Sequence, residues 1–136
     1  MVTLHILQLL ENEGFGSMNS KADGLFYEYL PLDGIGVAIM SRGTTLQRGL
    51  RDAQDFDLYS RGASNLLGAH KLEKIKDYFD NTYQVCELPT TPKSNKVYKN
   101  AAIIMTSNIE NIGLDEMDRV IFRVAAQIIY NKETNL

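Results

Sequence analysis

The stretch Val120–Tyr130, VIFRVAAQIIY, constrains the fold most, because its apolar residues recur with a period of two. Every even position is apolar, whereas the odd positions mix apolar side chains with Arg123 and Gln127. This alternation is typical of a β-strand that buries one face and uses part of the other. Seven of the eleven residues are β-branched or aromatic, as strands prefer. The sequence therefore predicts a long strand over residues 120–130.

A helix that begins at Asp115 is the alternative for the same stretch. Good helix formers occur within it, at Ala125-Ala126-Gln127. Four apolar residues also recur at helical spacing: Val120, Ile121, Val124 and Ile128. The segment Asn111–Asp115 is turn-like and would introduce either element. We favour the strand because its alternation continues without a break over eleven residues.

The first half of the chain predicts one helix and three strands. Residues 2–13 place Val2, Ile6, Leu9 and Leu10 on one helical face, and Gly14 stands where a C-terminal cap belongs. The strands predicted next are Leu25–Leu30, Ile35–Met40 and Asp55–Arg61. The Pro31–Gly34 turn favours a hairpin between the first two. Ser41–Gln54 has little periodicity and reads as a long loop of the functional or disordered kind.

The second half predicts a helix and then three strands. In the helix Ser64–Phe79, an inner stripe is formed by Ala69, Leu72, Ile75 and Phe79. Strands follow at Thr82–Leu88 and Val97–Ser107, before the closing strand. Hairpins on both sides of a lone helix indicate an α+β fold, with a mixed, mostly antiparallel sheet and two helices packed on one face.

The length, net charge and cysteine content of the chain limit the class of protein. At 136 residues, the chain fits a single domain over 1–136. A net charge of −3 argues against a dedicated nucleic-acid binder, which needs concentrated Lys and Arg. With Cys86 as the single cysteine, no intramolecular disulfide can form. The sequence contains neither an apolar run of about 20 residues nor a signal peptide, so we expect synthesis inside the cell and no membrane partner.

Motifs that would indicate catalysis or metal binding are weak. His5, His70 and Cys86 do not have metal-site spacing, and each is better explained as an ordinary core or surface residue. Gly14-Phe15-Gly16 follows a predicted helix, so it lacks the strand that a dinucleotide-binding loop requires. Asp52, Asp55 and Asp57 resemble a calcium loop but have no glycine or closing glutamate in register. We therefore expect no catalytic residue, metal or cofactor.

Two basic groups remain as candidate interaction surfaces. Arg42, Arg48 and Arg51 lie in the predicted loop, and arginine is favoured at interfaces because its planar group makes several directed hydrogen bonds. A solvated loop without a partner is the alternative. A second group, Lys93, Lys96 and Lys99, is better explained by solubility. The edges of the sheet also need cover, which a neighbouring copy of the chain could supply.

The order of these elements resembles a family of phage proteins. A Tyr-rich strand at Phe26–Leu30 is followed by the pattern Q-x-F-x-L-x-x-R at Gln54–Arg61 and by a helix of the type A-x-x-L-x-x-I-x-x-Y-F. The chain then closes with IGLDEMDRVIFRV at Ile112–Val124. This arrangement is similar to the tail terminator and tail-completion proteins of long-tailed bacteriophages, often labelled minor capsid proteins. Members often have a glycine where Asp118 stands.

The resemblance implies a structural protein of the virion tail or neck, made in the host cytoplasm. Such proteins form a ring, commonly a hexamer, that caps the tail tube, stops its polymerisation and joins the tail to the head or neck. Their partners are copies of themselves, the tail tube protein and the head-completion protein, and DNA passes through the lumen. The arginines of residues 41–54 would then contact a neighbouring subunit or the tube, and Arg123 and Gln127 would lie in the sheet used between subunits.

Other readings of the sequence remain open beside this one. They are another neck or head–tail connector protein, and a small intracellular module that holds a peptide at its sheet edge. An enzyme is the least favoured reading, because the motifs form no catalytic constellation. If the arginine loop is an assembly surface, changing Arg42, Arg48 and Arg51 to Ala should preserve the fold and impair assembly.

Overall fold

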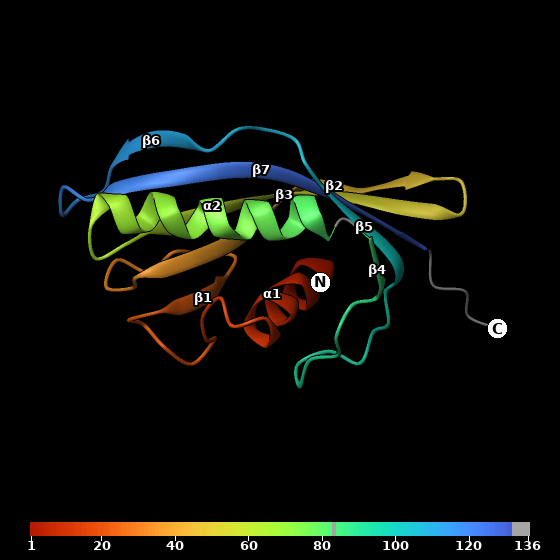
Figure 1. The fold of residues 1–136 in the computed structure, drawn as a ribbon. Helices are drawn as coiled ribbons and strands as arrows, with labels where there is room; N and C mark the ends of the chain where they lie inside the picture. Colours follow the sequence, from red (N-terminus) through yellow and green to blue (C-terminus); the bar gives the residue numbers. More distant parts are fainter. Residues whose placement is uncertain (83, 132–136) are drawn as a thin grey trace.

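The computed structural model describes residues 1–82 and 84–131, and at Arg48 and Cys86 it describes the backbone alone. Two helices and a seven-stranded sheet make up the fold (Figure 1). In chain order the elements are α1 (Val2–Asn12), β1 (Gly24–Tyr27), β2 (Gly36–Arg48), β3 (Arg51–Arg61), α2 (Asn65–Asn81), β4 (Gln84–Glu87), β5 (Lys99–Met105), β6 (Glu110–Leu114) and β7 (Val120–Asn131). The α+β class with a mostly antiparallel sheet is confirmed.

The closing strand β7 lies inside the sheet and is paired on both sides. The strand order is β1-β2-β3-β7-β5-β4, and β6 also pairs with β7. On one side β3 follows β7 over its length, whereas β5 and β6 share the other side in succession. The predicted alternation holds in the half where Val124, Ala126, Ile128 and Tyr130 are buried. The strand prediction for 120–130 is therefore confirmed, and the helix alternative is wrong.

The predicted hairpin between the first two strands is wrong, because β1 and β2 pair in parallel. After β1, Glu28 adopts a φ of 64°, and the chain returns through residues 29–35 before β2 begins. Since β1 has only four residues, a short connection suffices to bring the chain back to its start. Gly36 lies opposite Gly24 at a φ of 144°, and the two backbones approach closely there.

The predicted long loop 41–54 is instead a β-hairpin made by β2 and β3. Arg48 pairs with Arg51 across a two-residue turn, Gly49-Leu50, and Gly49 has a φ of 65°, as hairpin turns with glycine at this position require. The register shifts between Arg42 and Leu46, which marks a bulge or irregularity. Residues 41–47, 49 and 50 are exposed, so the hairpin tip has no buried face to impose hydrophobic alternation.

The turn predicted at Asn111–Asp115 is mostly strand. Residues 110–114 form β6, and the reversal into β7 occurs at residues 115–119. Four strands therefore follow α2, where three were expected. All five residues of β6 are exposed, which left no alternation in the sequence to identify it.

Both helices pack on one face of the sheet and form a common core with it. Nine consecutive residues of α1, Val2–Leu10, are buried, so this helix is less amphipathic than its apolar stripe predicts. It ends as predicted at Gly14, where the amides of Gly14 and Phe15 donate to the carbonyls of Glu11 and Leu10. The described helices include none that is long and apolar enough to cross a membrane.

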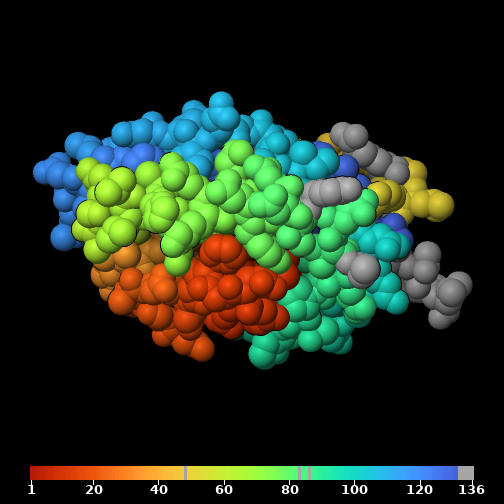
Figure 2. All heavy atoms as spheres, in the orientation of Figure 1, coloured from red at the N-terminus to blue at the C-terminus, as the bar shows by residue number. Residues whose placement is uncertain are grey.

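Helix α2 begins where its sequence predicts. The Ser64 side chain accepts a hydrogen bond from the amide of Leu67, as an N-cap does. Leu72, Ile75 and Phe79 face the core, with Gly68 in place of the expected Ala69 as the fourth buried position. Figure 2 shows the hairpin of β2 and β3 projecting at one end of the molecule, and the turn between β6 and β7 at the other.

Candidate functional site

The sheet face opposite the helices carries three of the five predicted interface residues. Arg42 lies in β2, and Arg123 and Gln127 lie in β7. Between these strands, β3 turns Phe56 and Leu58 into the core and Asp55 and Asp57 to the opposite face. This alternation brings together five polar side chains that we call the open-face cluster: Arg42, Asp55, Asp57, Arg123 and Gln127.

Asp57 is the centre of the open-face cluster. Its side chain is only 9% exposed, and its Oδ1 lies 3.4 Å from Nε of Arg42 and 3.9 Å from Nε of Arg123. Within the described residues, neither Asp57 Oδ1 nor Arg123 Nε makes a hydrogen bond. Beside them, Gln127 Nε2 donates to Asp55 Oδ1 at 2.9 Å. The ion pairs hold the charges in place, and the two atoms without a hydrogen bond are buried beneath the surface.

Arg51 has a different role from Arg42, although both were predicted for one loop. Its Nη2 donates to the carbonyl oxygens of Asn100 and Ile129, so it ties the start of β3, next to the hairpin turn, to β5 and β7. The side chain of Arg48 lies outside the described residues. The three arginines are therefore not one surface: Arg42 belongs to the open-face cluster and Arg51 stabilises the sheet.

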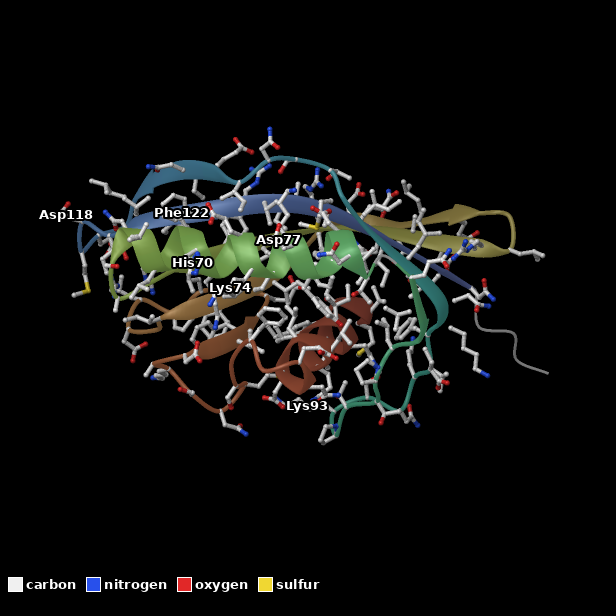
Figure 3. All side chains as sticks on the ribbon, in the orientation of Figure 1. His70, Lys74, Asp77, Lys93, Asp118 and Phe122 are labelled. Atoms are coloured by element: carbon white, nitrogen blue, oxygen red, sulfur yellow. The ribbon has the colours of Figure 1, made fainter. Side chains whose placement is uncertain are left out.

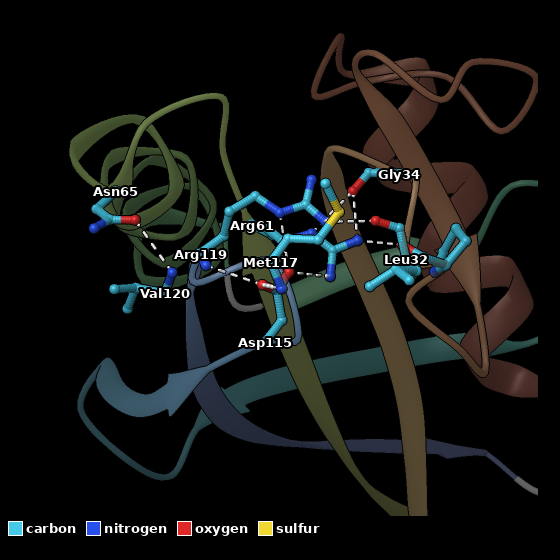
Figure 4. A network of polar contacts seen from close by, with 9 residues as sticks. Leu32, Gly34, Arg61, Asn65, Asp115, Met117, Arg119 and Val120 are labelled. Atoms are coloured by element: carbon cyan, nitrogen blue, oxygen red, sulfur yellow. Dashed lines mark hydrogen bonds and ion pairs between the residues drawn. The ribbon is translucent and has the colours of Figure 1, made fainter.

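The structure also contains a polar network that the sequence reasoning did not find (Figure 4). Arg61, at the end of β3, is buried, and its Nη1 lies 3.2 Å from Oδ2 of Asp115. The same guanidinium donates to the backbone carbonyls of Pro31 and Gly34. It thus joins the connection between β1 and β2 to the turn between β6 and β7.

Arg119 completes this network from the far side of Asp115. Its Nε lies 3.0 Å from Asp115 Oδ2, and its Nη2 donates to the carbonyl of Leu32. Asp115 Oδ1 accepts from the amides of Met117 and Arg119, which fixes the turn. The spacing of Asp115 and Arg119 in the resemblance motif was the available signal. It indicates a folded turn here, and the φ of 59° at Asp118 is a backbone conformation that favours glycine.

The electrostatics of the network keep both charges in place. Burial acts to raise the pKa of Asp115, but hydrogen bonds from the Arg119 and Met117 amides and the charge of Arg119 lower that pKa below its ordinary value. Burial and the neighbouring Arg119 lower the pKa of Arg61, and Asp115 opposes that change. The network therefore has a structural role, because its paired charges hold the connected segments together.

The remaining candidate residues do not come together as a metal or catalytic site. His5 is fully buried, whereas His70 lies exposed on α2 (Figure 3). The side chain of Cys86 lies outside the described residues. Among the side chains that are described, no three of His, Cys, Asp or Glu form a group that could hold a metal ion.

A cleft of about 410 Å³ lies between the end of α1 and the first turns of α2. Phe15, Ile35 and Leu67 supply apolar lining. Its charged lining includes Lys71 and Asp23, which form an ion pair of 3.1 Å with one another. These two charges are therefore already paired across the cleft.

Protein-family models, curated proteins and solved structures were compared with the chain, and none of them matches.

Proposed function

We propose that the chain is a structural subunit of a phage tail, a tail terminator that works as a ring and performs no catalysis. The observation that carries this proposal is the open face of the sheet. Neither helix covers that face, and it holds an ordered set of charges in Arg42, Asp57 and Arg123. An ordered polar face that no helix covers suits contact with another protein.

The chemistry of the open-face cluster supports an interface that forms after folding. A subunit that must stay soluble before assembly cannot expose a large apolar surface. Paired arginine and aspartate side chains keep the face hydrated in the free subunit. The guanidinium groups of Arg42 and Arg123, whose side chains are 46% and 33% exposed, still offer directed hydrogen bonds to a partner.

Charge balance also fits a ring through which DNA moves. The open-face cluster contains two arginines and two aspartates, and the whole chain has a net charge of −3. Phosphate contacts from concentrated cations would hold DNA and slow its passage. A lumen built from such subunits would let DNA slide.

The short end strands of the sheet, β1 and β4, favour this reading over a module that binds a peptide beside either of them. Strand β1 has four residues and is bridged on its outer side by Ser17, and β4 also has four residues. Peptide binding by strand addition needs a longer edge. We therefore place the partner surface on the open face.

The test combines native mass, electron microscopy and tube capping. Purified protein should form rings of several copies with a central channel, and adding it to polymerising tail tube protein should stop tube growth. The double variant Arg123→Ala, Gln127→Ala should fold and lose capping or ring formation. Lys74→Ala, an exposed position on α2, is the matched control and should keep both. Uncontrolled tube growth with the unaltered protein would refute the proposal.

A further inference from the structure

Two exposed apolar patches lie at opposite ends of the molecule. The first, the hairpin tip of residues 44–51, exposes Leu50 to 86% and Leu46 to 50%. The second, the turn patch, consists of exposed residues around the turn between β6 and β7: Leu32, Leu66, Leu114, Glu116, Met117 and Asp118. The backbone next to each patch is open to solvent at one glycine, because a Cβ at Gly49 or Gly113 would meet no atom within 4 Å.

The members of the turn patch are held together by the Arg61–Asp115–Arg119 network. Arg119 Nη2 lies 3.5 Å from Met117 Sδ and donates to the carbonyl of Leu32. Asn65 Oδ1 accepts from the amide of Val120, which ties the start of α2, with Leu66, to the same turn. The patch is therefore preorganised, and Figure 4 shows these groups around Asp115.

Strand β7 separates the two patches. It begins beside the turn patch, where Val120 pairs with Leu114, and it ends beside the hairpin, where Asn131 pairs with Arg51. Its twelve residues span about 40 Å. Figure 3 places Asp118 at the extreme end of the molecule, away from the hairpin.

The charges of the two patches are opposite. The hairpin tip contains two arginines, Arg48 and Arg51, and no carboxylate. The turn patch contains Glu116 and Asp118, which form no ion pair within the described structure, and no cation. Apolar side chains flanked by positive charge at one end thus complement apolar side chains flanked by negative charge at the other.

We propose that the hairpin tip of one copy docks on the turn patch of the next copy. The contact joins two different surfaces, so it is heterologous and runs head to tail, which closes into a ring when the rotation between copies allows. Leu50 and Leu46 fill the apolar centre beside Leu114 and Met117, with the charges around them. This inference rests on the proposed ring function for its biological setting, but the contact can be measured by itself.

Sedimentation velocity of three variants tests the contact. Leu50→Asp disables the hairpin tip, and Leu114→Asp with Met117→Asp disables the turn patch. Each change should weaken self-association at least about 30-fold, as loss of a central interface residue does. Val97→Asp, at an exposed residue outside both patches, is the matched control and should associate normally. Circular dichroism checks folding, and Leu50→Ser replaces Leu50→Asp if the latter unfolds.

Mixing the two disabled variants gives the decisive result. Leu50→Asp keeps a working turn patch and the other variant keeps a working hairpin, so the mixture should form complexes of two chains and no larger species. A monomeric unaltered protein, variants that associate normally, or a mixture without two-chain complexes would each overturn the proposal. Tube capping by a protein that lacks this contact would remove only this inference, whereas normal docking without capping would remove only the proposed function.

Discussion

Arg61 Nη1 and Asp115 Oδ2 lie 3.2 Å apart, and this ion pair connects the end of β3 to the turn that leads into β7. Both side chains are nearly inaccessible to solvent. A buried guanidinium without its partners leaves donors unsatisfied, so the pair also determines how the connection between β1 and β2 is placed. The first two predictions concern this pair.

Arg61→Ala should destabilise the fold by about 3 kcal/mol or more, because it removes one of the two cationic partners of the buried Asp115 and the hydrogen bonds to the carbonyls of Pro31 and Gly34. Arg61→Lys should recover only part of the loss, since a single ammonium group cannot replace the planar fork. Urea unfolding measures both. Lys76→Ala, which removes an exposed ion pair with Asp80, is the control and should cost less than about 1 kcal/mol.

Asp115 should make stability depend on pH in the acid range. Its pKa is lowered in the folded state, so its contribution is complete above the ordinary aspartate value of about 3.9 and is lost as pH falls through the lower folded value. Asp115→Asn should therefore be less stable than the unaltered protein at neutral pH, and the difference should shrink below about pH 3.9. Thermal melts from pH 7 to pH 2 measure this. A constant gap across that range would contradict the assigned role.

Gly36→Ala should destabilise the protein by about 3 kcal/mol or more, because its Cβ would lie 2.0 Å from the carbonyl oxygen of Gly24 and would part β1 from β2. Gly43→Ala is the matched comparison. Gly43 also has a positive φ, of 73°, but its Cβ would meet nothing within 4 Å. It should cost only about 1–2 kcal/mol for backbone strain. Equal losses at the two positions would mean that the close approach at Gly36 relaxes freely.

His5 should act as a structural residue that fixes α1 to the loop after β4. Its Nδ1 donates to the carbonyl of Pro89 at 2.9 Å, and its Nε2 lies 2.9 Å from Ser94 Oγ. His5→Phe keeps a ring against Tyr98 but removes both hydrogen bonds, so we expect a loss of about 1–3 kcal/mol in the free energy of unfolding. Ser94→Ala removes one of the two bonds and should cost less. Metal addition should not change the stability of either variant.

Arg51→Ala and Arg42→Ala should have separate effects, although the sequence suggested one role. Arg51 holds carbonyls of β5 and β7, so its loss should lower the free energy of unfolding by about 1–3 kcal/mol. Arg42 is half exposed beside Asp57, and its loss should cost about 1 kcal/mol or less. Assembly measured at equal folded concentration should depend on Arg42. An Arg51→Ala variant with an unchanged free energy of unfolding would show that Arg51 does not stabilise the sheet.

Elements with a buried face were readable from the sequence. The alternation over β7 and the stripe Leu72, Ile75 and Phe79 on α2 follow directly from burial against a common core. The cap at Gly14 is local chemistry, so it too was visible. The outer half of β2 and all of β6 were missed because their described residues are exposed on both faces, and only Gly49 signalled the turn.

The candidate site was readable only in part. The open-face cluster forms because β2 and β7 flank β3, which brings together Arg42, Arg123 and Gln127. The sheet order, with a parallel β1 and the closing strand at its centre, depends on long-range pairing that no local sequence pattern encodes. The sequence also could not separate Arg42 from Arg51, whose partners lie in β5 and β7. Arg61 was hidden because its partner comes from the other end of the chain.

The position of β7 has a consequence for biosynthesis. The last described strand in the sequence is paired with β3, β5 and β6, so a nascent chain cannot close its sheet until that segment has left the ribosome. Before then, the inner edges of β3 and β5 are unprotected and can recruit foreign strands. Chains that stop before Val120 should therefore aggregate or depend on chaperones. Because one late segment completes the sheet, a chain either acquires its whole sheet or is left with unpaired strand edges.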